Sequence, residues 1–242
     1  MFREWTAANR LSLNVEKTYV MLVSNSPIRL QPPEIFYGNI KLKIVDKCVF
    51  LGVTIDNKLK FDDHINQISK KVSKSIGILY KLHLIVPKNI LTNIYYSLVY
   101  PYLNYCNIIW GYSYRIHLQP LFLMQKRILR ILNNAPFLAH TDPLFFSLNI
   151  LKLYDIFTYS LCIYMFKNLN QFQNFSTHGY NTRHGNDIRS GRGRTVVSGR
   201  SISVIGPITW NSIPESVRNS NTLPSFKRAL KLYLLSNYQS NS

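Results

Sequence analysis

Residues 62–81 read DDHINQISKKVSKSIGILYK, and this stretch decides the fold class. At about 100° per residue, as in an α-helix, its apolar side chains share one face: Ile65, Ile68, Val72, Ile76 and Leu79. Its lysines fall on the opposite face, within roughly 40° of one another: Lys70, Lys74 and Lys81. Asp62 or Asp63 would cap the start, where a carboxylate complements unpaired N–H groups. The stretch predicts an amphipathic helix.

Residues 118–132 repeat this design. One broad face is apolar: Leu118, Leu121, Phe122, Ile128, Leu129 and Leu132. The other face carries Lys126, Arg127 and Arg130. Between the two amphipathic stretches, residues 89–100 predict a helix that is stopped or kinked at Pro101. A further helix is expected over residues 151–167.

The two ends of the chain predict smaller elements. A short helix is expected over residues 1 to about 14, and strands over 18–23, 40–45 and 48–55, the last running through Gly52. Residues 201–205 predict a short strand followed by a Gly206-Pro207 turn, and Pro224 opens a last helix. Its inward residues would be Phe226, Leu230, Tyr233 and Leu234, with Lys227, Arg228 and Lys231 outward.

The expected fold is therefore mainly α with a small antiparallel β-sheet near the N-terminus, an α+β class containing a helical thumb-like bundle. Four segments are predicted. Residues 1–61 hold the small sheet, and residues 62–168 form the helical domain. Residues 169–200 form a basic linker rich in Arg, Gly and Asn. Residues 201–242 form a small segment that ends in a helix.

The charge balance points to a polyanionic partner. Lys and Arg exceed Asp and Glu by 29 to 11, a net charge of +18, and no acid occurs from His64 to Thr141. Nucleic acid or an anionic membrane face would suit such a chain. The uncharged residues 89–114 contain asparagines, a proline and several tyrosines, which favours a buried kinked helix pair over a membrane span.

Other features narrow the function class. Three widely spaced cysteines and the absence of a signal peptide predict an intracellular protein, cytoplasmic or nuclear and not secreted. The only adjacent acidic pair is Asp62-Asp63. Two-metal nucleotidyl transfer needs clustered carboxylates, and this pair instead opens a helix. The sequence therefore predicts no metal site and no cofactor in this chain.

Six blocks, in order, resemble one family. The first two are WTAANRLSLNVEKT (residues 5–18) and FLGVTID (50–56), the latter followed by Leu59, Phe61, His64 and Ile65. The others are YCNIIWG (105–111), QKRILR (125–130), YNTR (180–183), and WNSIP (210–214) with Phe226-Lys227 after it. Together they resemble the end of the palm, the thumb and the trailing region of reverse transcriptases from non-LTR (LINE-type, jockey- or CR1-like) retrotransposons.

The resemblance implies roles for two short motifs. Lys17 matches a lysine that positions the incoming triphosphate or protonates the leaving pyrophosphate; the alternative is an exposed lysine that begins an edge strand. Phe50, Leu51 and Gly52 match the primer-grip turn, where backbone near a glycine approaches the primer closely. The alternative is an ordinary strand with a bulge at Gly52.

In the family, the catalytic aspartate hairpin comes before the first block, so this chain is expected to lack it. The chain is then expected to be inactive as a polymerase alone, with Mg²⁺ serving only an intact enzyme and the front half supplied in trans. The alternatives are a host-adopted binding or scaffold protein and a degenerate copy of an element.

The expected partner is nucleic acid, either RNA, DNA or a hybrid duplex, bound without sequence preference. Lysine and arginine contacts to phosphate give affinity without sequence reading. The candidate residues are the two basic helix faces, Lys70, Lys74, Lys81, Lys126, Arg127 and Arg130, and the linker arginines, Arg183, Arg189, Arg192 and Arg194. Tyr112 or Tyr114 is a candidate for stacking on single strands.

Overall fold

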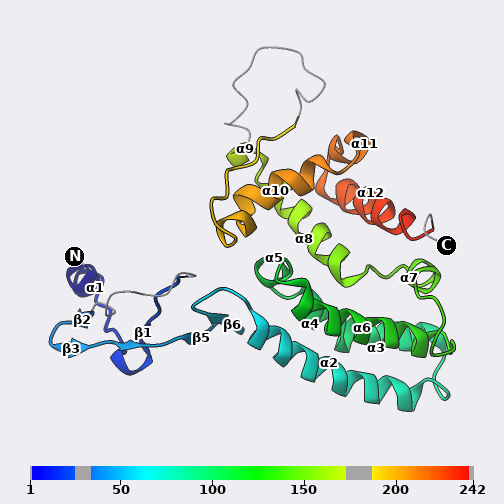
Figure 1. Cartoon of the computed structure of the whole chain (residues 1–242), viewed down its shortest axis with the longest axis horizontal. Coiled ribbons are helices and arrows are strands. Elements are labelled where there is room, and N and C mark those ends of the chain that lie inside the picture. The colour runs from blue at the N-terminus through cyan, green and yellow to red at the C-terminus, as the bar shows by residue number, and fades with distance from the viewer. Residues whose placement is uncertain (1, 25–33, 173–186, 240–242) are drawn as a thin grey trace, which may run out of the picture. The chain divides into compact units, whose positions relative to one another are not determined.

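The computed structural model describes residues 2–24, 34–172 and 187–239. The chain divides into two compact units, Met1–His64 and Ile65–Ser242. The first unit holds the described strands and the second is helical (Figure 1). The predicted fold class, mainly α with small β elements, is confirmed.

The first unit contains one short helix and short strands in pairs. Helix α1 spans Phe2–Ala8, shorter than expected, and the 3-10 helix η1 spans Val15–Lys17. The strands are β1 (Tyr19–Val20), β2 (Phe36–Tyr37), β3 (Ile40–Lys41), β4 (Lys43–Ile44), β5 (Lys47–Phe50) and β6 (Val53–Asp56). The pairs β2–β3 and β5–β6 are antiparallel, whereas β1 pairs with β4 in parallel.

The single strand predicted over residues 48–55 is wrong, because the chain reverses at its centre. Strands β5 and β6 form a hairpin in which Phe50 pairs with Val53. The two residues between them have positive φ angles, 46° at Leu51 and 79° at Gly52. Two successive positive φ values are typical of the tight turn whose twist matches a two-residue hairpin. Gly52 therefore serves a turn rather than a bulge.

Asp56 organises the segment that leads into the first long helix. Its carboxylate accepts hydrogen bonds from the backbone N–H groups of Lys58, Lys60 and Phe61, at 2.8–3.2 Å. Two positive φ angles in this segment, 51° at Leu59 and 60° at Phe61, are held by these bonds. The backbone N–H of Thr54 also donates to His64 Nδ1 at 3.3 Å. A buried aspartate thus fixes the exit from the hairpin.

The second unit consists of packed helices (Figure 1). Helix α2 (Asp62–Leu82) begins at the unit boundary, with Asp62 and Asp63 in its first turn. It is followed by α3 (Lys88–Leu98), α4 (Tyr100–Asn104), α5 (Asn107–Trp110), α6 (Arg115–Leu132), α7 (Asp142–Ser147), α8 (Leu153–Lys167) and α9 (Leu169–Phe172). Residues 173–186 are outside the described part of the chain. The elements after them are η3 (Ser198–Arg200), α10 (Ile202–Asn211), α11 (Glu215–Arg218) and α12 (Leu223–Ser236).

The apolar faces predicted for α2 and α6 are buried as expected. The helix predicted to stop near Pro101 ends at Leu98, and Pro101 lies in the first turn of α4, where a missing N–H costs no helical hydrogen bond. Helix α8 is central, because it packs against α4, α5, α6, α10 and α12.

The predicted strand over residues 201–205 and the Gly206-Pro207 turn are wrong, because these residues belong to α10. Pro207 has no N–H to donate to the carbonyl of Ser203, and the N–H of Gly191 donates to that carbonyl instead, at 3.0 Å. A Cβ on Gly206 would lie 2.7 Å from Sδ of Met165. The glycine therefore permits close packing of α10 on α8, which overrides the local strand preference.

Helix α12 follows the predicted pattern with two differences, one of which is Tyr233, predicted to point inward but only half-buried. Thr222 caps its start by accepting a hydrogen bond from the N–H of Ser225 at 3.3 Å. Phe226, Leu230 and Leu234 are buried. Lys231, predicted to point outward, is half-buried, and this burial lowers the pKa of its ammonium group.

The core of the helical unit contains a fully buried polar side chain, Gln125 of α6. Its Nε2 donates to the hydroxyl of Tyr95 on α3 at 3.0 Å and to the carbonyl of Leu151 at 2.9 Å. Its Oε1 accepts the backbone N–H of Leu153, the first residue of α8, at 2.8 Å. One amide therefore joins α3, α6 and the start of α8.

Asp56 gives the first unit a defined pH dependence. Burial alone would raise the pKa of Asp56, but the backbone donors at Phe61, Lys60 and Lys58 outweigh it, so the pKa lies below its ordinary value. The ionised carboxylate then stabilises the fold above the unfolded pKa of about 3.9. This stabilisation is lost as the pH falls through the lower folded pKa. Amide hydrogen exchange at residues 58–61, measured against pH, should show that protection is lost as the pH falls below the folded pKa of Asp56. Asp56→Asn should flatten the profile, whereas an unchanged profile would refute the role.

Replacing Gln125 with leucine should destabilise the helical unit by about 3 kcal/mol or more, because three buried backbone and hydroxyl groups lose their partner at roughly 1–3 kcal/mol each. Urea denaturation measures this change. Gln119→Leu is the matched control, since half-exposed Gln119 accepts one hydrogen bond, from the hydroxyl of Tyr154 at 3.0 Å. Equal effects of the two substitutions would contradict the assigned importance of Gln125.

Candidate nucleic-acid interface

The basic faces predicted for α2 and α6 are accessible to solvent. Lys70, Lys74 and Lys81 are exposed along α2. On α6, Arg127 is exposed, while Lys126 and Arg130 are half-exposed. Each of these cations therefore has its charge at or near the surface.

The structure brings two of the predicted arginines into one hollow, which we call the α2–α6 hollow. It has a volume of about 290 Å³. Its lining residues come from the end of α2, the end of α6 and the connection after α6: Tyr80, His83, Arg127, Arg130, Ile131, Asn134, Ala135 and Phe137. Tyr80, His83 and Phe137 were not predicted from the sequence as site residues. The available signal was a Tyr and a His flanking Lys81 at the end of a basic helix.

Contacts within the α2–α6 hollow orient its side chains. The Nε of Arg130 donates to the carbonyl of Ala139 at 3.0 Å. Its guanidinium carbon lies 6.0 Å from the centroid of the Phe137 ring. The rings of Tyr80 and His83 stack with centroids 5.1 Å apart. The hollow therefore presents flat aromatic and guanidinium groups.

Two further lysines lie over aromatic rings. The Nζ of Lys126 is 4.9 Å from the centroid of Phe122 on its own helix. The Nζ of Lys71, a residue that the sequence argument missed, is 5.2 Å from the ring of Tyr102. Such cation–π contacts hold the charge without neutralising it. Lys71 thus adds one more cation to the exposed side of α2.

Three of the four carboxylates that follow the acid-free segment have partners within the fold. Asp142 pairs with Lys152 at 2.8 Å, and Asp187 pairs with Arg218 at 3.1 Å. Asp155 accepts a hydrogen bond from the hydroxyl of Tyr238, and burial raises the pKa of this aspartate. The segment from His64 to Thr141 contains no acid of its own. Its cations therefore create a local excess of positive charge.

The linker arginines are placed only in part. Arg183 lies outside the described residues. Arg189, Arg192 and Arg194 are exposed on the segment that precedes η3. That segment is anchored to α10, because Ile188 exchanges two hydrogen bonds with the side chain of Asn211, at 2.8 and 3.1 Å. The Tyr180–Arg183 block of the resemblance also lies outside the described residues.

The two motifs of the first unit are both exposed. Lys17 ends η1, and its backbone N–H donates to the side chain of Asn14 at 3.2 Å. The apolar residues at the tip of the β5–β6 hairpin are exposed, Leu51 at 72%. A leucine with a positive φ is unusual, so this tip combines backbone strain with apolar exposure. No role is tested for Lys17 or for Phe50, Leu51 and Gly52, which remain predictions.

Among the described residues, no group of three or more His, Cys, Asp or Glu side chains could hold a metal ion. In the same part of the chain, none of the helices has both the length and the apolar character needed to cross a bilayer.

The comparisons with known proteins agree with the motif resemblance. The chain is similar to the RNA-directed DNA polymerase from mobile element jockey of Drosophila melanogaster, 26% identical over 159 residues, and to that of Drosophila funebris, 28% identical over 157 residues. It is also 23% identical over 158 residues to the probable RNA-directed DNA polymerase from transposon X-element of Drosophila melanogaster. Each match covers 64% of this chain and 17% of the relative.

No family model and no solved structure matches the chain. The sequence relatives nonetheless define the class: the chain is similar to a region of the reverse transcriptases encoded by non-LTR, LINE-type retrotransposons. It spans only about a sixth of the length of the curated relatives that it matches.

Proposed function

We propose that this chain is a nucleic-acid-holding region of a retrotransposon reverse transcriptase, which grips a template–primer duplex without reading its sequence. The observation that carries the proposal is the α2–α6 hollow. There, Arg127 and Arg130 meet aromatic groups of α2 within a segment that contains no carboxylate. The similarity to RNA-directed DNA polymerases supplies the ligand class.

The spacing of the α2 lysines suits a phosphate backbone. Lys70 and Lys74 are separated by four residues, which corresponds to a rise of about 6 Å along a helix. This is close to the rise of two nucleotides of one strand along the duplex axis, at about 3.4 Å each. Contacts of this kind position a duplex and carry no sequence information. They would let the protein hold its substrate while the substrate moves.

Under this proposal, the chain does not perform nucleotidyl transfer by itself. The adjacent carboxylates of Asp62 and Asp63 lie in the first turn of α2, and Asp63 pairs with Lys47. Two-metal catalysis requires carboxylates that bring two cations to within about 4 Å of each other. We therefore assign the Mg²⁺ ions, and the carboxylates that hold them, to other parts of the polymerase, acting in cis or in trans.

A specific observation favours a second candidate, a scaffold that contacts another protein. Leu84 and Ile85, between α2 and α3, are strongly exposed, as are Phe137 and Leu138 after α6. Exposed apolar residues of this size are typical of protein contacts. A host-adopted scaffold would use them without nucleic acid, so duplex binding distinguishes the two functions.

Removing three interface charges should weaken duplex binding and its salt dependence. The triple variant Lys70→Gln, Lys74→Gln and Arg127→Gln should lower the slope of log K against log salt by about 2.7, since each phosphate contact contributes about 0.9. Fluorescence anisotropy with a labelled hybrid duplex at several salt concentrations measures this slope.

The matched control removes the same number and kind of charges from exposed positions on α8 and α12: Lys167→Gln, Lys227→Gln and Arg228→Gln. It should change the slope little. Equal effects of the two triples would mean that net charge alone drives binding. The absence of salt-dependent binding in the unmodified chain would overturn the proposal and favour the scaffold.

A further inference from the structure

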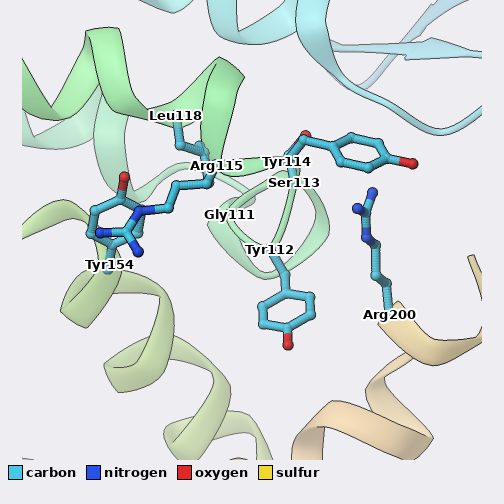
Figure 2. Close-up of a pocket in the computed structure, with 8 residues that line it drawn as sticks. All are labelled: Gly111, Tyr112, Ser113, Tyr114, Arg115, Leu118, Tyr154 and Arg200. Carbon is cyan, nitrogen blue, oxygen red and sulfur yellow. The ribbon is translucent and has the colours of Figure 1, made fainter. Parts of the chain in front are cut away.

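A second hollow, which shares no lining residue with the α2–α6 hollow, lies in the helical unit (Figure 2). Its volume is about 660 Å³, within the range of about 300–1,000 Å³ that is typical of small-molecule sites. Four chain segments line it: the turn between α5 and α6, the start of α6, the first turn of α8, and η3. The residues are Gly111, Tyr112, Ser113, Tyr114, Arg115, Leu118, Tyr154 and Arg200.

The lining combines two arginines with aromatic rings and includes no acid. The guanidinium carbon of Arg200 lies 3.7 Å from the centroid of the Tyr114 ring, and that of Arg115 lies 5.7 Å from the ring of Tyr154. The hydroxyl of Tyr154 donates to Gln119 at 3.0 Å, which fixes this ring. Both cations are therefore held by π-faces, and their N–H donors are not matched by a carboxylate within the lining.

Tyr112 offers a supported aromatic surface. One side of its ring stacks on Phe157 of α8, with centroids 5.5 Å apart. The side chain is nevertheless 49% exposed, and Figure 2 shows its ring at the edge of the hollow. Gly111 makes this position possible, because a Cβ there would lie 2.6 Å from the carbonyl oxygen of Asn107 and 2.8 Å from the Phe157 ring. The ring is thus fixed from behind and accessible from the front.

We propose that this hollow binds one nucleotide of single-stranded nucleic acid. The base stacks on the accessible face of Tyr112, and Arg115 and Arg200 contact the adjoining phosphates. Aromatic rings and guanidinium groups bind single strands in this way without sequence preference. A base inside a duplex is covered on both faces by its neighbours, so the site takes a single-stranded end or overhang. The inference rests on the proposed function and adds a second substrate form to it.

The test uses the full chain and oligonucleotides of about ten nucleotides, as single-stranded DNA and RNA, and as an abasic strand of equal charge. Tyr112→Leu should weaken binding of the normal strands by about tenfold, the loss expected for one base stacked on an aromatic ring. The same variant should bind the abasic strand as the unmodified chain does. Tyr112→Phe keeps the ring and should bind normally. Tyr105→Leu, at an exposed tyrosine that lines neither hollow, is the matched control and should bind normally.

The charges are tested on the same strands. Arg115→Gln and Arg200→Gln should each reduce the salt slope by about 0.7, the value for one phosphate contact on a single strand. Equal binding by the Tyr112→Leu variant and the unmodified chain would overturn the site. So would equal losses on normal and abasic strands, which would report a structural defect.

Duplex affinity, measured on the same proteins, separates the two proposals. A Tyr112-dependent single-strand signal with no duplex binding would support this site and contradict the proposed function. Duplex binding with no Tyr112-dependent single-strand binding would support the proposed function and contradict this site. The hollow would then bind another ligand, such as a peptide.

Discussion

The helical unit depends on the buried amide of Gln125. The amide hydrogen-bonds to the hydroxyl of Tyr95 on α3, to the carbonyl of Leu151 and to the N–H of Leu153 at the start of α8. Any of these groups left without a hydrogen bond would destabilise the core. Both candidate sites are built next to this amide. Arg127 and Arg130 follow Gln125 on α6. Tyr154 directly follows Leu153, whose N–H donates a hydrogen bond to the Gln125 side chain. The amide thus holds α6, which lines both hollows, against α3 and against the start of α8, which carries Tyr154.

The charge distribution is the second constraint. Three of the four carboxylates after residue 141 have partners within the fold: Asp142 pairs with Lys152, Asp187 pairs with Arg218, and buried Asp155 accepts a hydrogen bond from Tyr238. The basic residues of α2 and α6 lie in the segment from His64 to Thr141, which contains no acid, and two of them, Lys71 and Lys126, lie over aromatic rings. A surface of this composition attracts polyanions at long range and loses that attraction as salt screens it. A cation over an aromatic ring recurs at Arg200 and Tyr114.

Sequence periodicity predicted the amphipathic helices well, because a helix with one apolar stripe must bury that stripe. Every apolar residue predicted to face inward on α2 and α6 is buried. The failures have a common cause. Residues 201–205 favour a strand locally, but packing on α8 and the donor at Gly191 stabilise a helix. The hairpin at Leu51-Gly52 and the bonds of Asp56 depend on the backbone path, which no local pattern specifies. The two hollows join residues that are distant in sequence, such as Tyr114 and Arg200, so residue patterns could supply their members but not their association.

Hydrogen–deuterium exchange of the whole chain, with and without a template–primer duplex, tests the central claim most directly. The account predicts that the duplex increases protection of residues 79–83 at the end of α2 and 127–137 at the end of α6, with the effect disappearing at high salt. Protection confined to α10 and α12, or no change in exchange anywhere, would contradict it.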